Sequence, residues 1–247
     1  MLSDPKRTKD EIVQWIRDYF EENGPDCDAV VGISGGKDSS IVAALCAEAL
    51  GAKRVVGVMM PNGEQPDLPD SHRIIEGLGI RFAYVDIARA VRALSIGVSC
   101  NMDVSTQAKI NLPARIRMAT LYAVAQSLPY GGRVANTCNR SEDFVGYSTK
   151  YGDSAGDFSP LANLMVHEVI QIGHELKLPA DLVEKVPSDG LCGKTDEDNL
   201  GFTYAQLDAY ISCGASGSED IDKKIATMNE RNLHKLNPMP TYCPVLF

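Results

Sequence analysis

The residues from Ala29 to Gly51, AVVGISGGKDSSIVAALCAEALG, hold two adjacent glycines and several polar side chains between two apolar runs. The first run predicts a buried strand, and the small residues from Ser39 to Leu50 predict a helix. The N-terminus of a helix presents unpaired N–H groups and a partial positive charge. Because Gly35 and Gly36 have no Cβ, the backbone can curl around an oxyanion. This junction therefore predicts an anion-binding turn.

The residue types in the turn distinguish it from a common phosphate-binding loop. A Walker A loop requires G-x-x-x-x-G-K-[ST], but here three residues separate Gly32 from Gly36, and Asp38 follows Lys37. A carboxylate beside bound phosphates is repulsive unless a cation lies between them. Since Mg²⁺ binds through one or two carboxylates and phosphate oxygens, Asp38 predicts a magnesium ligand. Further hydrogen-bond donors to a phosphate are the hydroxyl groups of Ser34, Ser39 and Ser40.

Strand-like and helix-like segments alternate along the chain. Apolar runs predict strands at Asp28–Ile33, Arg54–Met60, Arg81–Ile87 and Gly132–Asn136. The alternation predicts a doubly wound α/β fold, with a parallel sheet covered by helices on both faces. No linker or repeat interrupts the sequence, so a single domain over residues 1–247 is expected.

The helices are predicted from apolar spacing, caps and breakers. The first begins with the capping box Thr8-Lys9-Asp10-Glu11 and ends at Gly24-Pro25. Others are expected at residues 71–78, 104–128, 166–176, 179–185, 203–213 and 218–235. The helix over 104–128 is expected to be interrupted near Pro113. Loops are expected at 61–69 and 146–160, and a mobile loop at 187–201.

Composition excludes several classes of protein. The net charge of -9 argues against a nucleic-acid-binding face. No apolar run is long enough to span a membrane, and the first residues lack a secretory signal, so a cytoplasmic location is expected. The seven cysteines contain no C-x-x-C pair, which makes a disulfide framework or a zinc site unfavourable.

The turn from Ser34 to Ser39, SGGKDS, resembles the S-G-G-x-D-S signature of the ATP-pyrophosphatase superfamily. These enzymes cleave ATP between the α- and β-phosphates, and the resemblance implies that this turn holds the pyrophosphate. An ordinary glycine turn in an α/β protein has no need of the aspartate or the serines.

Four further stretches are similar to the ammonia-dependent NAD synthetases of that superfamily. The run Asn111 to Met118, NLPARIRM, is similar to N-x-x-A-R-x-R-M, and helical geometry puts Arg115 and Arg117 on different sides of a helix. The run Asn136 to Glu142, NTCNRSE, resembles G-T-x-N-x-S-E, with Asn136 in place of the glycine. It follows the last predicted strand, and open parallel sheets bind ligands at the carboxyl ends of their strands.

The other two stretches lie further along the chain. The run Gly146 to Asp157, GYSTKYGDSAGD, resembles G-[FY]-x-T-K-Y-G-D-x-x-x-D. The run Lys194 to Gly201, followed by Tyr204 and Asp208, is similar to Q-T-D-E-x-x-L-G-x-x-Y-x-x-[LI]-D, with Lys194 in place of glutamine. The family often carries a basic residue in an L-x-K stretch, where this chain reads Leu164-Met165-Val166-His167.

The resemblance implies four overlapping groups of site residues. ATP is expected to bind Ser34, Gly35, Gly36, Lys37, Asp38, Ser39, Ser40, Arg117 and Thr137. The deamido dinucleotide is expected to bind Arg115, Lys150, Tyr151, Asp153, Asp157, His234 and Lys235. Mg²⁺ is expected on Asp38 and Glu142, and the residues expected to act in catalysis are Asp38, Lys150 and Asp153. The phosphate contact of the replaced L-x-K lysine is either missing or supplied by His167 or by His234 and Lys235.

The reaction that the resemblance implies is the amidation of nicotinic acid adenine dinucleotide. Its carboxylate attacks the α-phosphorus of ATP, pyrophosphate leaves, and ammonia converts the acyl-adenylate to NAD⁺ and AMP. Glutamine-dependent relatives carry an added hydrolase-like domain, for which 247 residues are expected to be too few, so free ammonia is the expected donor. A separate glutaminase partner is left open. The family also implies a homodimer, with the helix of Arg115 at the contact.

Two alternatives follow from the same residues. A tRNA-modifying or sulfur-transferring pyrophosphatase would be expected to show a basic surface or a C-x-x-C pair. A nucleotide-binding module without catalysis would keep the glycine turn but would not need Glu142, Lys150 and Asp153 as well. Taken singly, the two arginines fit a solvated helix face, Glu142 fits a helix N-terminal charge, and residues 194–201 fit a flexible acidic loop.

Overall fold

A computed structural model describes residues 1–185 and 195–243 of the chain. In this part of the chain, strands form one parallel sheet in the order β3-β2-β1-β4. The strands are β1 (Asp28–Gly32), β2 (Val55–Met59), β3 (Arg81–Tyr84) and β4 (Gly132–Val134). Val30 of β1 lies in register with Val56 of β2 and Val134 of β4. The predicted parallel sheet is confirmed, although each strand is shorter than the apolar run that predicted it.

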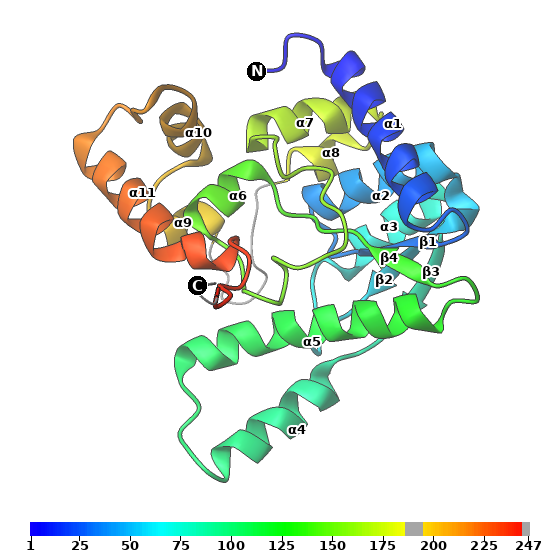
Figure 1. Ribbon diagram of the computed structural model, residues 1–247, viewed down its shortest axis with the longest axis horizontal. Coiled ribbons are helices and arrows are strands. Elements are labelled where there is room, and N and C mark those ends of the chain that lie inside the picture. Colours follow the sequence, from blue (N-terminus) through cyan, green and yellow to red (C-terminus); the bar gives the residue numbers. More distant parts are fainter. Residues whose placement is uncertain (186–194, 244–247) are drawn as a thin grey trace.

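Helices cover both faces of the sheet (Figure 1). On one face α2 packs on β1 and β2, with α1, α3 and α7 around it, and on the other face α5 packs on β1 and β4. Ala29 and Val31 belong to the apolar core beneath α2, whereas Val30 belongs to the core beneath α5. Such burial on both sides is typical of a parallel strand. The bounds of these helices are Pro5–Asn23 for α1, Lys37–Leu50 for α2, Leu68–Leu78 for α3, Thr106–Ser127 for α5 and Val166–Glu175 for α7.

The direction of winding reverses beside β1. The chain builds β1, β2 and β3 towards one edge of the sheet and then returns through α5 to place β4 on the other side of β1. The carboxyl ends of β1 and β4 are therefore adjacent at the switch point, where open α/β sheets bind their ligands. This confirms the predicted doubly wound α/β fold.

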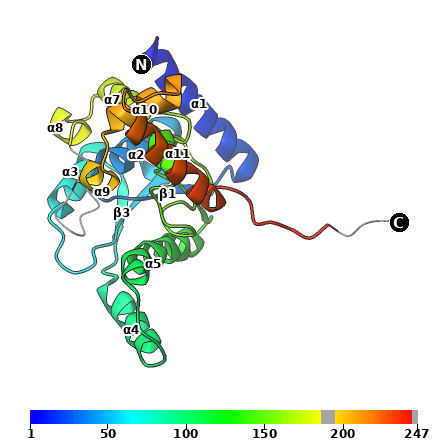
Figure 2. The ribbon, with the colours of Figure 1, turned by 90° about the vertical axis from the view of Figure 1, so that its left-hand side faces the viewer.

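A helical lobe lies beside the sheet (Figure 1). It has an apolar core of its own, which includes Val145, Leu200, Leu207 and Ile225. Its helices are α6 (Arg140–Val145), α9 (Asp196–Leu200), α10 (Tyr204–Cys213) and α11 (Glu219–Asn232). Short connecting elements elsewhere are η1 (Ala52–Arg54), α8 (Ala180–Val183) and η2 (Leu233–Lys235), and residues 236–243 after η2 run away from the body (Figure 2).

One helix contributes a partly buried valine, Val91, to the core beneath α5 and is otherwise mostly exposed. Helix α4 (Ala88–Ser99) packs along the N-terminal half of α5, and the pair projects beyond the sheet (Figures 1 and 2). No residue of α4, all of which the structure describes, is buried. The sequence analysis did not predict α4.

Two predictions about helices were wrong, one about the start of the first helix and one about a break inside α5. The first helix begins one turn before the expected capping box, because Asp4 accepts a hydrogen bond from Arg7 N at 3.0 Å and Pro5 occupies the first helical turn. Helix α5 runs through Pro113 without interruption. The loss of one backbone donor there is offset by packing of Met118 and Leu121 against the sheet.

Two loop predictions also needed correction. The expected loop at 61–69 already contains the start of α3, and the expected mobile loop at 187–201 contains α9 at its end. Residues 186–194, which include most of that loop, lie outside the described residues. Helix α6 was not predicted at all. None of the described helices has the length and apolarity that a membrane crossing requires.

Candidate active site

The carboxyl ends of β1 and β4 open into a pocket of about 530 Å³. Its lining comes from the turn after β1, the start of α2, the segment after β4 and one side of α5. Residues 146–149, Asp153, Asp196 and Lys235 line further sides, and Asp67 and Lys185 line the side next to the glycine turn. Motifs that are distant in the sequence therefore share one pocket at the switch point of the sheet.

The turn after β1 is held together by its own hydroxyl groups. Ser34 Oγ accepts a hydrogen bond from Gly36 N at 3.2 Å and lies 3.1 Å from Ser39 Oγ. The hydroxyls of Ser39 and Ser40 donate to Gly36 O at 3.2 and 2.7 Å. Ser40 is buried behind the turn, while Ser34, Gly36 and Ser39 line the pocket. The turn is thus preorganised for an anion at the start of α2.

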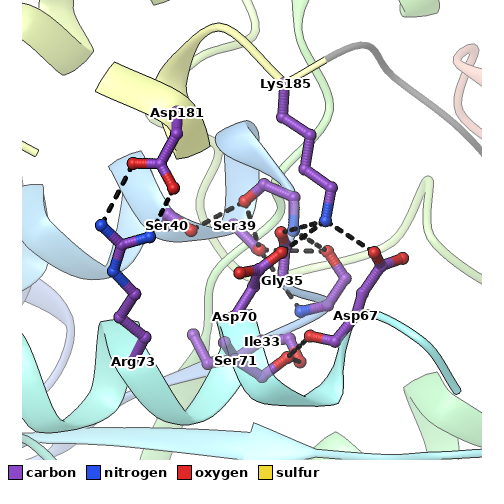
Figure 3. Close-up of polar contacts among 12 residues, drawn as sticks. Ile33, Gly35, Ser39, Ser40, Asp67, Asp70, Ser71, Arg73, Asp181 and Lys185 are labelled. Carbon is purple, nitrogen blue, oxygen red and sulfur yellow. Dashed lines mark hydrogen bonds and ion pairs between the residues drawn. The ribbon is translucent and has the colours of Figure 1, made fainter. Parts of the chain in front are cut away.

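Gly35 is required by the backbone itself. Its φ is +83°, in the region that favours glycine, and a Cβ at this position would overlap the carbonyl oxygen of Asp67. The turn therefore packs directly on the segment that leads into α3. Ser71 strengthens this contact, since its hydroxyl donates to Ile33 O at 3.3 Å (Figure 3).

Lys37 begins α2 with a side chain that is almost fully buried. Its Nζ donates a hydrogen bond to Asp38 Oδ2 at 2.7 Å. The largest single influence on the pKa of Lys37 is burial, which acts to lower it. The negative charges of Asp38 and Glu142 act in the opposite direction and together outweigh burial, so the pKa of Lys37 lies above its ordinary value. The ammonium group is therefore an internal counter-ion to these two carboxylates.

Asp38 and Glu142 reach the pocket from α2 and α6, and Asn139 contacts both. Asn139 Nδ2 donates to Asp38 Oδ1 at 3.2 Å, and Asn139 N donates to Glu142 Oε2 at 3.3 Å. Burial and the negative charge of Asp38 raise the pKa of Glu142 to about 8. The two carboxylates thus repel one another across the pocket.

These two side chains fit a magnesium ion. Mg²⁺ uses one or two carboxylates and completes its shell with phosphate and water oxygens. In the described part of the chain, no cluster of three or more His, Cys, Asp or Glu side chains could enclose a metal. Burial and the charge of Asp38 raise the pKa of Glu142, and a divalent cation between the two carboxylates would relieve their repulsion. Asp38 and Glu142 would then supply two ligands of the ion, and phosphate and water oxygens would supply the others.

The two arginines of α5 have different environments, as their spacing predicts. Arg117 lines the pocket and donates from Nε to Met60 O at 3.1 Å. Burial lowers the pKa of Arg117, and the charge of Asp153 opposes this shift. Arg115 is exposed, and its Nε donates to Lys150 O at 3.2 Å.

Asn136 organises the loop that carries Asp153. Its Nδ2 donates to Asp153 O at 2.8 Å and to Ala155 O at 3.0 Å. Its Oδ1 accepts a hydrogen bond from Cys138 N at 2.9 Å. The amide that replaces a glycine in the second motif therefore ties the end of β4 to the third motif. The carboxylate of Asp153 accepts a hydrogen bond from Thr149 N at 2.9 Å and lines the pocket.

With this geometry established, comparisons with known proteins identify the family. Residues 8–239 match the NAD synthase family. The chain belongs to the NAD synthase family.

Individual relatives agree with this assignment. The NH(3)-dependent NAD(+) synthetase of Pyrococcus furiosus is 40% identical over 203 residues, which cover 82% of this chain and 77% of the relative. The enzyme of the same name from Methanococcoides burtonii is 37% identical and covers 93% and 92% of the two chains. A solved structure of NMN synthetase from Francisella tularensis superimposes with a TM-score of 0.88 at 32% identity, covering 98% of this chain and 99% of that one. The resemblance stated from the motifs is confirmed.

Several residues expected from the NAD synthase motifs lie outside the pocket lining of the described chain. Lys150 donates from Nζ to His234 O at 2.6 Å, and its ammonium lies 5.3 Å from the ring centre of Tyr151. Asp157 is engaged elsewhere, because its carboxylate accepts hydrogen bonds from Val134 N at 2.7 Å and from a tyrosine hydroxyl. This contact anchors the loop to β4. Thr137, in contrast, lines the pocket.

The position of the L-x-K lysine of NAD synthases is occupied here by Val166. Val166 is buried in the apolar core of the helical lobe. The neighbouring His167 is bound to Asp208, with Nδ1 and Oδ2 2.7 Å apart. Of the residues suggested as substitutes, Lys235 lines the pocket, where its Nζ donates to Gly146 O at 2.6 Å. Burial lowers the pKa of Lys235, against the opposing charge of Asp153.

Asn139, which contacts Asp38 and Glu142, and Lys185, which lines the pocket, were not given roles by the sequence analysis. Asn139 lay within a motif, and its place as N-cap of α6 was readable from the Glu142 three residues later, which is a capping-box pattern. Lys185 lies in no motif and was missed. The third motif also contains Tyr151 with a positive φ of 62°, a conformation that no pattern in the sequence predicted. The residues from Pro187 to Lys194, including Gly193, lie outside the described residues.

Proposed function

We propose that the chain amidates nicotinic acid adenine dinucleotide with ammonia, at the expense of ATP, and releases NAD⁺, AMP and pyrophosphate. The observation that carries this proposal is the convergence of the SGGKDS turn, Asp38 and Glu142 on one pocket of a NAD synthase fold. The names of the curated relatives agree with it.

The turn after β1 would hold the phosphates of ATP. The N–H groups at the start of α2 and the hydroxyls of Ser34 and Ser39 are the donors that line the pocket. Gly35, Lys37 and Ser40 would act through the shape and charge of this turn. Arg117 and Thr137 would contact the nucleotide further along the same pocket. Catalysis would then rest on positioning and on charge stabilisation of the departing pyrophosphate.

Asp38 and Glu142 are the residues that would hold Mg²⁺. When bound, the ion supplies charge neutralisation at the phosphate oxygens. Around it, Lys37 balances the two carboxylates, and Asn139 fixes their orientation through its side chain and its N–H. The helix N-terminus and the serines orient the pyrophosphate as a leaving group.

The deamido substrate would enter from the side of the third motif. Asp153 and Lys235 line the pocket there, and Asp153 would orient the ammonia or the nicotinate end of the substrate. Arg115, Lys150, Tyr151 and His234 form the neighbouring surface outside the pocket and would bind the distal part of the substrate. A structural role fits Asp157 better, because its carboxylate is occupied by β4.

A homodimer would extend this surface. Apolar side chains are exposed on helix α4, at Leu94 and Ile96, on strand β3 at Phe82, and near the start of α5 at Ile110. A projecting apolar surface of this kind is typical of a protein interface. The same α5 carries Arg115, as expected for a helix at the subunit contact.

A second candidate substrate is nicotinic acid mononucleotide. The solved NMN synthetase of Francisella tularensis covers nearly the whole of both chains with a high TM-score, which favours this alternative. The reaction would be the same, with a substrate that lacks the distal nucleotide. The dinucleotide would need the surface residues outside the pocket, and the mononucleotide would not.

Release of AMP measures both candidates in one experiment. The purified chain would be supplied with ATP, Mg²⁺ and ammonium together with either the dinucleotide or the mononucleotide. AMP release that requires both ammonium and the dinucleotide supports the main proposal, and preference for the mononucleotide replaces it with the alternative. Release that needs neither ammonium nor either substrate contradicts both. A location in the cytoplasm stays a prediction.

A further inference from the structure

A lysine outside every motif borders the glycine turn. Lys185, which follows α8, places its Nζ 2.6 Å from Asp67 Oδ1 and 2.6 Å from Asp70 Oδ2 (Figure 3). The same Nζ lies 3.5 Å from Gly35 O in the turn itself. Lys185 and Asp67 both line the pocket, whereas Asp70 does not belong to its described lining.

Of the three hydrogen bonds of Lys185, the one to Gly35 O is the longest, and it is the bond that an anion would replace. An ammonium group has three donors. Two are used in short bonds to Asp67 and Asp70, and the third faces Gly35 O at 3.5 Å, the outer limit of a hydrogen bond. Burial is the largest influence and lowers the pKa of Lys185, but the two carboxylates raise it above its ordinary value, so the group stays charged.

The other cations of the pocket are committed elsewhere. Lys37 is almost fully buried and bound to Asp38. Arg117 is bound to Met60 O and Lys235 to Gly146 O, both on walls other than the outer side of the turn. Among the described residues that line the pocket, Lys185 is therefore the cation beside Gly35.

We propose that Lys185 is a pyrophosphate ligand of this site, held at the outer edge of the glycine turn by Asp67 and Asp70. The inference rests on the proposed function, because it assumes that the turn holds pyrophosphate. The two carboxylates position the ammonium and offset its positive charge, so its attraction for the anion is weaker than that of an unpaired lysine. Pyrophosphate is a product of the proposed reaction, and a weaker interaction allows it to dissociate.

A neighbouring ion pair provides a matched control. Arg73 of α3 binds Asp181 of α8 through two hydrogen bonds, at 2.5 and 3.1 Å, and so links the same two helices (Figure 3). This pair is not part of the described pocket lining. Arg73→Met and Lys185→Met therefore both remove a link between α3 and α8, but only the second removes a charge from the pocket.

Binding of inorganic pyrophosphate with Mg²⁺, measured by calorimetry on the full chain, tests the proposal. Since a hydrogen bond to a charged group is a strong one, Lys185→Met is expected to weaken binding about tenfold. Arg73→Met is expected to leave it unchanged, while both variants lower the thermal unfolding temperature. Asp70→Asn removes a competitor for the ammonium and is expected to tighten binding about threefold.

The outcomes separate this inference from the proposed function. A wild-type chain that does not bind pyrophosphate overturns both. Wild-type binding that Lys185→Met leaves unchanged, or that Arg73→Met weakens equally, overturns only the role of Lys185. Weaker pyrophosphate binding by Asp70→Asn would also overturn it. If Lys185 only links the two helices, the variant should bind pyrophosphate more weakly, whereas a Lys185 that binds pyrophosphate directly should bind it more tightly once Asp70 no longer competes.

Discussion

Helices α2 and α4 both carry apolar residues, but their surroundings differ completely. Helix α2 lies on the sheet, its middle residues from Ile41 to Cys46 are buried, and its N-terminus forms the floor of the pocket. Helix α4 touches α5 and otherwise exposes its apolar side chains. An apolar stripe therefore shows that a helix has a partner, without showing whether the partner is the same chain.

The largest expected effect on activity comes from Asp38, at the N-terminus of α2. Asp38→Asn keeps the shape of the side chain but removes the charge that would bind Mg²⁺. We expect the rate of AMP release to fall by about a hundredfold or more, in the range seen when a charge-stabilising group is lost. The Mg²⁺ titration of the remaining activity should shift to higher concentration. A titration identical to the wild type would contradict the metal assignment.

The comparison between the two helices is tested directly by a pair of truncations. Ile41→Ala in α2 opens a cavity in the core and is expected to lower the free energy of unfolding by about 2–5 kcal/mol. Ile96→Ala in α4 removes an exposed side chain and should cost about 0.5 kcal/mol or less in a dilute sample. Denaturant unfolding measures both. Equal losses at low protein concentration would show that the Ile96 side chain packs within its own chain.

Gly35→Ala tests the backbone of the turn. The substitution forces a positive φ on a residue with a Cβ and pushes the turn away from Asp67 O. We expect a loss of stability of about 1–3 kcal/mol from strain. The KM for ATP should rise, since the N–H groups of the turn move. Gly51→Ala is a useful control, because φ is +84° there too but a Cβ would meet no atom within 4 Å. We expect the two variants to lose similar stability, and we expect only Gly35→Ala to bind ATP more weakly.

The smallest effect on folding is expected on the projecting face. Leu94→Glu adds a charge to the exposed apolar surface of α4 and should leave the unfolding of the monomer nearly unchanged, within about 0.5 kcal/mol. If α4 forms the subunit contact, light scattering will show the variant shifted from dimer to monomer. Arg92→Glu, a charge change on the same helix, serves as the control. A wild-type chain that is monomeric and fully active removes the dimer proposal.

Much of the fold could be predicted because it depends on local pattern. The apolar runs around Val30, Val56 and Val134 predicted strands, and the glycine turn predicted both an anion site and the start of a helix. The order of these elements was enough for a doubly wound sheet, since right-handed crossovers leave few arrangements. The pocket then follows from topology, because the ends of β1 and β4 must meet at the switch point.

Other features depended on contacts between distant residues. Helix α4 was missed although Val91, Leu94 and Val98 recur at helical spacing, because no element was predicted between Ile87 and Val104. The continuity of α5 through Pro113 is maintained by packing on the sheet, which local rules do not include. The different environments of Arg115 and Arg117 follow from helical spacing, but which of them faces the pocket is decided by how α5 lies on β1 and β4.

The sequence by itself determined the strands, the SGGKDS turn and the membership of a nucleotide-activating family, because these depend on residue types at short spacing. The tertiary structure alone decided that Asn139 would reach Asp38, that the Asp157 carboxylate would bind the backbone of β4, and that Lys185 would reach Asp67 and Gly35. Those contacts join residues far apart in the chain. Their geometry is set by how helices pack on a sheet, and no local pattern encodes that packing.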